Sequence, residues 1–127
     1  MSEGVVLVAD DDDDILLLVT TRLTRDGFGV IAARNGLEAL ALAHEHKPAV
    51  AVLDVGMPGL DGLQVLQAIR ETAALSHTRV LLLTAKAQES DVRRGYDSGA
   101  DAYVKKPFSP GELAERVRTL YEADGVR

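Results

Sequence analysis

The chain has 127 residues, which is enough for one domain and too few for two domains of ordinary size. It has no cysteine, so disulfide bonds and thiolate metal sites are excluded, and a reducing compartment fits best. Its net charge of −6 argues against a nucleic-acid surface, and no apolar run approaches the roughly 20 residues that a membrane span needs. We expect a cytoplasmic domain that contacts neither nucleic acid nor membranes directly.

Five short apolar segments recur along the chain, and we predict that each forms a β-strand. They cover residues 5–9, 29–33, 49–53, 79–83 and 102–104. Three of them consist almost entirely of valine, alanine and leucine, which is typical of strands covered on both faces in a parallel sheet. Because helical patterns alternate with these strands, the sequence predicts a doubly wound α/β domain with right-handed crossovers.

The segments between the strands place apolar residues at helical spacing. The residues expected to face the core are, in chain order, Ile15, Leu18, Val19 and Leu23; Leu37, Leu40 and Ala41; Val65, Leu66 and Ile69; and Leu113, Val117, Leu120 and Tyr121. Another helix, about residues 88–98 and fourth in chain order, has a weaker apolar face. Capping-box spacing joins Asn35 to Glu38 and Ser109 to Glu112, which predicts where two of the helices begin.

Five consecutive aspartates, Asp10 to Asp14, follow the first predicted strand. We expect Asp13 or Asp14 to cap the first helix, because a carboxylate oxygen accepts hydrogen bonds from the free N–H groups of a first turn. Asp12 then has no assigned role beyond contact with solvent.

Polar side chains follow four of the five strands at their carboxyl ends, where doubly wound sheets bind their ligands. Asp10 and Asp11 come after the first strand and Asp54 after the third. Thr84 follows the fourth strand and Lys106 the fifth. We expect these three carboxylates, one hydroxyl and one ammonium to meet at the same edge of the sheet.

This set of groups suits the chemistry of a divalent cation and a phosphoryl group. Neighbouring carboxylates repel one another, and a cation with oxygen ligands relieves that repulsion. Mg²⁺ typically accepts one or two carboxylates and keeps several waters. A phosphoryl group arriving at one carboxylate would then need a cation and a hydroxyl for its other oxygens, and positioning with charge neutralisation is most of what its transfer requires.

Four motifs carry a resemblance to a known family. They are Val-Ala-Asp-Asp-Asp at 8–12, Leu-Asp-Val-Gly-Met-Pro-Gly-Leu-Asp-Gly at 53–62, Leu-Thr-Ala-Lys at 83–86 and Gly-Ala-Asp-Ala-Tyr-Val-Lys-Lys-Pro-Phe at 99–108. Together they resemble the receiver domain of two-component response regulators, in the CheY-like superfamily. The resemblance implies one receiver domain over residues 1–127 with its core at about 4–122. It also implies a flavodoxin-like (βα)5 fold with a five-stranded parallel sheet of order 2-1-3-4-5.

The resemblance implies a phosphoacceptor and its metal site. Asp54 would take a phosphoryl group from the phosphohistidine of a sensor histidine kinase or a histidine phosphotransfer protein. Asp11, Asp54 and the carbonyl of Gly56 would bind Mg²⁺ directly, and Asp10 mainly through water. The chain would be a signalling phosphoacceptor that assists its own phosphorylation and dephosphorylation, not an enzyme with a separate substrate.

The resemblance also implies how the phosphoryl group is sensed. Lys106 would contact its oxygens, with a cis bond to Pro107, and Thr84 would hydrogen-bond them. Thr84 and Tyr103 would switch together. Lys105 precedes the motif lysine, but its side chain should point to the other face of the strand.

The face formed by helix 4, strand 5 and helix 5 would then control a downstream protein or a fused output domain. Asp101, Glu112 and Arg116 fit the salt bridges that join such faces in DNA-binding relatives. Val92 and Ala102 stand where a base and an acid are expected. We therefore expect a monomer or a weak dimer.

Three other functions fit parts of the sequence less well. A Mg²⁺-dependent aspartyl-phosphate phosphatase would use the aspartates after the first strand, but it needs a cap for which this chain has no room. A flavin carrier needs a phosphate loop where five aspartates would repel phosphate. A receiver-like domain that docks without phosphorylation would not need the full acceptor set. The sequence does not identify the kinase or the output, and it leaves open whether a longer protein contains this domain.

Overall fold

The computed structural model describes residues 4–85 and 99–125, with five strands and four α-helices in alternation. The strands are β1 (Val5–Ala9), β2 (Gly29–Ala33), β3 (Val50–Asp54), β4 (Arg79–Thr84) and β5 (Ala102–Lys105). The α-helices are α1 (Asp13–Arg25), α2 (Gly36–His46), α3 (Gly62–Arg70) and α5 (Pro110–Gly125), and a 3-10 turn, η1, covers Ala73–Leu75. The fourth predicted helix, about residues 88–98, lies outside the described residues.

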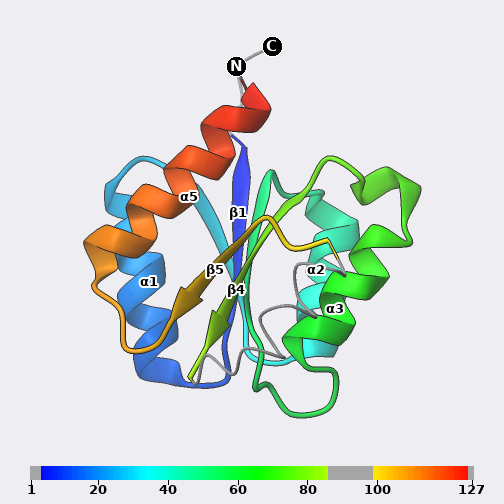
Figure 1. Cartoon of the computed structure of the whole chain (residues 1–127), viewed down its shortest axis with the longest axis horizontal. Helices are drawn as coiled ribbons and strands as arrows, with labels where there is room; N and C mark the ends of the chain where they lie inside the picture. The colour runs from blue at the N-terminus through cyan, green and yellow to red at the C-terminus, as the bar shows by residue number, and fades with distance from the viewer. Residues whose placement is uncertain (1–3, 86–98, 126–127) are drawn as a thin grey trace.

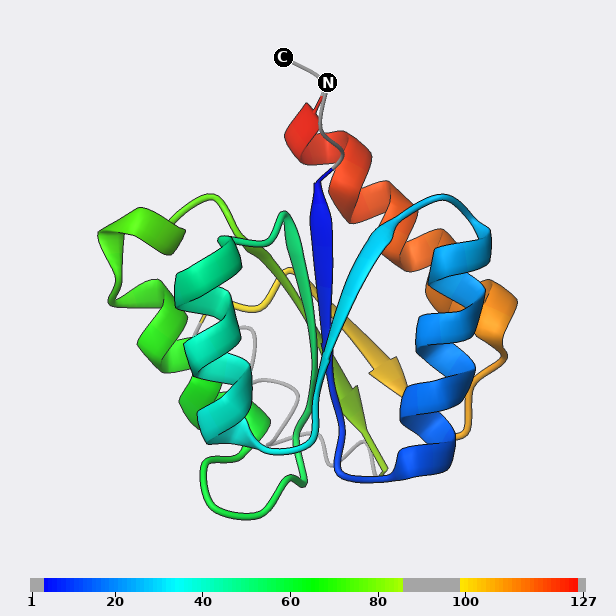
Figure 2. The same ribbon diagram turned by 180° about the vertical axis from the view of Figure 1, so that it is seen from behind.

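All five strands are parallel, in the order β2-β1-β3-β4-β5. The predicted doubly wound, flavodoxin-like fold is therefore confirmed. Helices α1 and α5 cover one face of the sheet, and α2 and α3 cover the other (Figures 1 and 2). Among the described residues, no helix is long and apolar enough to cross a membrane.

The core consists of two apolar clusters, one on each face of the sheet. Alternate residues of a strand contribute to different clusters: Val6 and Val8 of β1 pack towards α1 and α5, whereas Leu7 and Ala9 pack towards α2 and α3. Both clusters exclude water, as expected for strands without a solvent-facing side. Packing on both faces holds the central strands in place, and with them the edge of the sheet formed by their carboxyl ends.

The structure changes the predicted inner face of α1. Leu16, Val19 and Leu23 are buried, whereas Leu18 is 45% exposed. The prediction for Leu18 was therefore wrong, and Leu16 takes its place in the core.

The inner face of α2 also differs from the prediction. Its buried residues are Gly36, Ala39 and Ala43, while Leu37 is 68% exposed and Ala41 is also exposed. Leu40 packs against the core cluster as predicted. A small residue is needed at position 36 because the β3–α3 loop passes close to the start of this helix. A Cβ added at Gly36 would collide with the backbone of Leu60.

Side chains at the starts of α1, α2 and α5 cap these helices. Asn35 Oδ1 accepts a hydrogen bond from the Glu38 N–H at 2.8 Å, and Ser109 Oγ accepts one from the Glu112 N–H at 3.0 Å, as predicted. The expected capping of α1 by Asp13 or Asp14 was wrong, because Asp12 is its N-cap residue.

The predicted core residues of α3 and α5 are confirmed. Val65, Leu66 and Ile69 are buried on one side of the sheet. On the other side, Leu113 and Val117 are buried, and Leu120 and Tyr121 pack against the same cluster.

Candidate functional site

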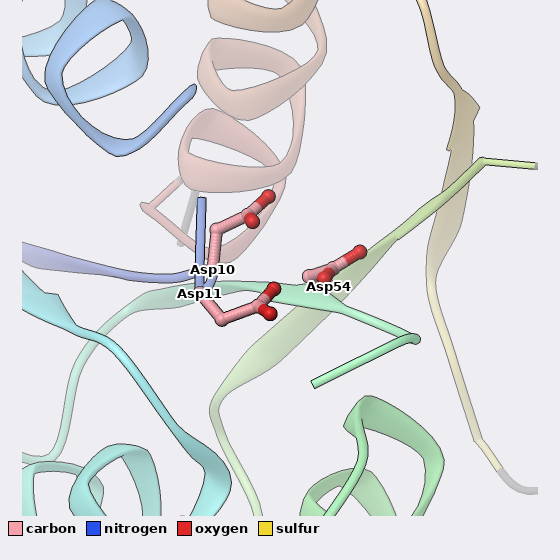
Figure 3. A group of neighbouring side chains, drawn as sticks. All are labelled: Asp10, Asp11 and Asp54. Atoms are coloured by element: carbon pink, nitrogen blue, oxygen red, sulfur yellow. The ribbon is translucent and has the colours of Figure 1, made fainter. Parts of the chain in front are cut away.

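Three carboxylates meet where β1 and β3 end. Asp10 and Asp11 follow β1, and Asp54 is the last residue of β3. Carboxylate oxygens of all three lie within 4.8 Å of one another, and Figure 3 shows them as neighbouring side chains. Asp10 is 0% and Asp54 5% exposed, whereas Asp11 is exposed. The structure therefore brings together the acidic residues that the sequence predicted.

The strand register holds Asp54 in place. Asp54 lies opposite Leu83 of β4, and the next amide, that of Val55, donates to the Leu83 carbonyl at 2.8 Å. Helix α3 begins against the same strand end, since a Cβ at Gly62 would lie 2.6 Å from the Asp54 carbonyl oxygen. Glycine at 62 is thus needed for the close approach of α3 to the acidic cluster.

Lys106 brings a positive charge to the two buried carboxylates. Its Nζ lies 2.9 Å from Asp10 Oδ2 and 3.1 Å from Asp54 Oδ1, and its side chain is 17% exposed. Its backbone N–H donates to the Thr84 carbonyl at 2.7 Å, which ties the segment after β5 to the end of β4. The bond from Lys106 to Pro107 is cis, as expected, and Lys105 is exposed.

Burial and charge shift the proton affinities of this group. Burial raises the pKa of the Asp54 carboxyl, and the neighbouring Asp10 charge raises it further, against the opposing effects of Lys106 and the Gly56 amide. Burial lowers the pKa of the Lys106 ammonium, but Asp10 and Asp54 outweigh burial, so its pKa is raised overall. A protonated Lys106 therefore offsets part of the repulsion between the carboxylates.

The buried carboxylate of Asp10 is only partly satisfied. Its Oδ1 accepts a hydrogen bond from the Asp12 N–H at 2.9 Å. Its Oδ2 has the Lys106 charge nearby but no hydrogen bond of good geometry among the described residues. A buried anionic oxygen without such a bond is costly, and a cation relieves that cost.

The acidic cluster fits a divalent cation that prefers oxygen ligands. Asp10, Asp11 and Asp54 supply carboxylate oxygens close enough to share one ion. Gly56 lies in the exposed loop directly after β3, where the family resemblance implies a carbonyl ligand. The donor set is all oxygen, which suits Mg²⁺ better than softer metals.

Thr84 and Tyr103 lie on neighbouring strands near this cluster. Thr84 is the buried last residue of β4 and pairs in register with Lys105. Tyr103 pairs with Leu82 and packs, half-buried, against the core cluster on the α2 and α3 side. Thr84 thus reaches the same edge of the sheet as the carboxylates, and Tyr103 lies one strand away.

Sequence reasoning missed two contacts of the aspartate run. Asp12 caps α1, and Asp13 forms an ion pair with Arg34, whose Nε lies 2.7 Å from its Oδ1. The run itself gave no signal that separates its members. A Glu or Gln three residues after an aspartate would have marked that aspartate as the helix cap, as in a capping box. Ile15 occupies this position after Asp12, so the marker is missing.

Comparison with known proteins identifies the family. A family model described as the response regulator receiver domain matches residues 6–118. The chain belongs to the response regulator receiver family. The resemblance drawn from the four sequence motifs is thereby confirmed, and this receiver domain is a signalling domain of two-component systems.

The relatives of this receiver domain include longer proteins. It is 44% identical over 122 residues to a protein of Porphyra purpurea named probable transcriptional regulator ycf27, a match covering 95% of this chain and 49% of that protein. It is 42% identical over 115 residues to the transcriptional regulatory protein SrrA of Staphylococcus aureus, covering 91% of this chain and 46% of SrrA. The receiver domain thus spans about half the length of these curated relatives.

Solved structures agree with the fold. The crystal structure of a CheY-like response regulator receiver domain protein from Methanospirillum hungatei superposes with a TM-score of 0.91 at 25% identity, over 98% of each chain. The fold of this chain is therefore that of a known receiver-domain structure.

Proposed function

We propose that Asp54 is the phosphoacceptor of this receiver domain and that Mg²⁺ bound by Asp10, Asp11, Asp54 and the Gly56 carbonyl supports the transfer. The observation that carries the proposal is the gathering of three carboxylates within 4.8 Å of one another, with the Lys106 ammonium beside two of them. When bound, Mg²⁺ would neutralise negative charge on the carboxylates and on the phosphoryl oxygens.

In the proposed transfer, a carboxylate oxygen of Asp54 attacks the phosphorus of a phosphohistidine. The new bond joins that oxygen to phosphorus, and the phosphorus–nitrogen bond to the imidazole breaks. Asp54 attacks as the carboxylate, so its raised pKa must still leave it ionised at working pH. The Lys106 charge 3.1 Å from Oδ1 supports that ionised form.

After transfer, Lys106 and Thr84 would bind the phosphoryl oxygens. The Lys106 ammonium already lies at the carboxylate that would carry the group, and Thr84 is fixed next to it through the 2.7 Å bond from the Lys106 N–H to its carbonyl. A shift of Thr84 towards the phosphoryl group would be felt by Tyr103, on the strand paired with β4. We propose Thr84 and Tyr103 as the residues that switch.

The partners follow from the family and from charge. The donor would be a sensor histidine kinase or a histidine phosphotransfer protein. The output would pass from the face formed by the predicted fourth helix, which lies outside the described residues, with β5 and α5, to a downstream protein or a fused domain. The curated relatives are named as transcriptional regulators, but with a net charge of −6 this chain is poorly suited to contact DNA itself. We propose residues 1–127 as one domain with its core at about 4–122.

The proposal is tested by the intact mass of the protein after incubation with Mg²⁺ and acetyl phosphate. We expect the wild-type chain to gain one phosphoryl group and to lose it again by hydrolysis, assisted by the same site. Asp54→Asn should gain none, and removal of Mg²⁺ with EDTA should abolish labelling of the wild type.

Asp61→Asn is the matched control for Asp54→Asn. It makes the same chemical change in the loop that follows β3, and asparagine caps helix α3 as well as aspartate does. This variant should be labelled as fully as the wild type. Undiminished labelling of Asp54→Asn would reject the assignment of the acceptor.

A further inference from the structure

Asp12 lies between the buried Asp10 and the first turn of α1. Its Oδ1 accepts hydrogen bonds from the backbone N–H groups of Asp14 at 2.9 Å and Ile15 at 3.2 Å. Its carbonyl accepts a further bond from the Leu16 N–H at 3.0 Å. Its own N–H donates to Asp10 Oδ1 at 2.9 Å. Asp12 is thus fastened to the helix by its side chain and to Asp10 by its amide.

The bond from Asp12 fixes the direction of the Asp10 carboxylate. Because Oδ1 is held by the amide, rotation of the carboxylate is restricted and Oδ2 stays turned towards Lys106, 2.9 Å away. Asp10 is 0% exposed, so water from bulk solvent does not replace a lost bond to Oδ1 easily. Movement of the Asp12 peptide would therefore move or release a carboxylate of the acidic cluster.

We infer that Asp12 is a positioning residue for the metal site, because capping α1 fixes the amide that orients Asp10. The inference rests on the proposed function, since it concerns how well the acidic cluster binds Mg²⁺. Asp12 is not one of the three aspartates whose oxygens lie within 4.8 Å of one another, and its Oδ1 is occupied by the helix. Its effect on the metal passes through Asp10.

The charge of Asp12 offers a competing explanation, because any carboxylate near the site attracts a cation. Two substitutions separate charge from position. Asp12→Asn removes the charge but keeps an oxygen that caps a helix equally well. Asp12→Ala removes both the charge and the cap.

The experiment measures two properties of the full chain for each variant. The first is Mg²⁺ affinity, by calorimetric titration. The second is hydrogen exchange of the Asp14 and Ile15 amides in EDTA, which reports the cap without any metal. We expect Asp12→Ala to bind Mg²⁺ about fivefold more weakly, because the free energy of one lost helix cap corresponds to about that change in affinity. Its Asp14 and Ile15 amides should exchange faster than in the wild type.

Asp12→Asn should keep both amides protected and stay within about twofold of the wild-type affinity, because the charge it loses is exposed and screened. Asp13→Ala is the matched control. It removes the same charge one residue later, from a side chain that pairs with Arg34 and makes no cap bond. It should behave like Asp12→Asn.

Two results would overturn the inference while the proposed function stands. Equal losses of affinity in Asp12→Asn and Asp12→Ala would show that charge is responsible. Fast exchange in Asp12→Ala without loss of affinity would show that the cap and the metal site are uncoupled. A wild-type chain that bound no Mg²⁺ would overturn the inference together with the metal part of the proposed function, and labelling of Asp54 is measured separately.

Discussion

Asp10 and Asp54 place two carboxylates inside the protein, and the Lys106 ammonium lies within 3.1 Å of both. Folding alone gains little from such an arrangement, because each buried charge loses its hydration. The third carboxylate, that of Asp11, adds charge at the mouth of the same cluster. At the level of single residues, this arrangement is compatible with a bound cation and contributes little to the stability of the fold.

Asp11 gives the first test of this account. Asp11→Asn should weaken Mg²⁺ binding at least about tenfold, or roughly 1.4 kcal/mol, because it removes a charged ligand from the ion. Calorimetric titration measures the affinity directly. Asp13→Asn removes one charge from the same run and should change it far less. Unchanged affinity in Asp11→Asn would exclude Asp11 as a direct ligand.

The raised pKa of Asp54 gives a pH-dependent prediction. In the folded protein, Asp54 takes up a proton at a higher pH than it does in the unfolded chain, where the ordinary value is 3.8. Its ionised form therefore opposes folding above the folded pKa, and this penalty is relieved as pH falls through that pKa towards 3.8.

Asp54→Asn removes the penalty, so in EDTA at pH 7 it should unfold at a higher urea concentration than the wild type. The difference should shrink as the pH is lowered towards 4. Urea unfolding of both proteins across this range is the measurement. A variant that was less stable than the wild type at pH 7 would show that ionised Asp54 is stabilising.

The residues of the site were largely predictable because their order along the chain follows the strand ends. Asp10, Asp54, Thr84 and Lys106 each come directly after or at the end of an apolar segment, and parallel strands bring such positions to one edge. Asp12 was not predictable in this way. Five adjacent aspartates have the same chemistry, and only the backbone path shows which of them caps the helix.

At the scale of the elements, the helices carry the main errors of sequence reasoning. In α1, residues 15–19 are all apolar, so spacing alone does not identify the inner face. In α2, the fully buried residues are glycine and alanine, the β3–α3 loop lies close to Gly36, and the larger Leu37 faces solvent. Apolar size is a poor guide where an element packs closely against its neighbour.

The corrected face of α1 can be tested with two neighbouring leucines. Leu16→Ala should lower the free energy of unfolding by about 2–5 kcal/mol, because it leaves a cavity in a close-packed core. Leu18→Ala, at a half-exposed position of the same helix, should cost less than about 1 kcal/mol. Urea unfolding of both variants gives the comparison. A larger loss for Leu18→Ala would restore the face that the sequence predicted.

At the scale of the whole molecule, ion pairs at the opposite end of the sheet join three elements. Arg70, the last residue of α3, donates to the Thr78 carbonyl at 2.8 Å and the Gly99 carbonyl at 3.0 Å, and its Nη2 lies 2.9 Å from Asp101 Oδ2. The same Asp101 oxygen accepts the Val80 N–H at 2.8 Å. These bonds connect α3 to the starts of β4 and β5.

The place of Asp101 bears on the expected dimer. The resemblance to receiver domains suggested Asp101 as one partner in salt bridges between two copies, but in this structure its carboxylate already pairs with Arg70. A dimer contact through Asp101 would have to compete with that internal bond. The expectation of a monomer or a weak dimer stays a prediction.

Removal of the Arg70 guanidinium tests how much these bonds contribute to the stability of the protein. Arg70→Met should lower the free energy of unfolding by about 1–3 kcal/mol, since it removes the Arg70 donor from the Thr78 and Gly99 carbonyls and one charge from Asp101 in a half-buried position. Arg34→Met, which breaks the exposed pair with Asp13, should cost less than about 1 kcal/mol. Urea unfolding in EDTA measures both. Equal, small losses would show that the Arg70 bonds are no more than surface pairs.

If the carboxylate cluster serves phosphoryl transfer to Asp54, the phosphoryl group must be found on that residue after labelling. The chain is labelled with acetyl phosphate and Mg²⁺, digested rapidly at low pH and analysed by peptide mass spectrometry. We predict one labelled residue, Asp54, with the label removed by hydroxylamine as an acyl phosphate requires. A label found on another residue, or one that resists hydroxylamine, would contradict the account.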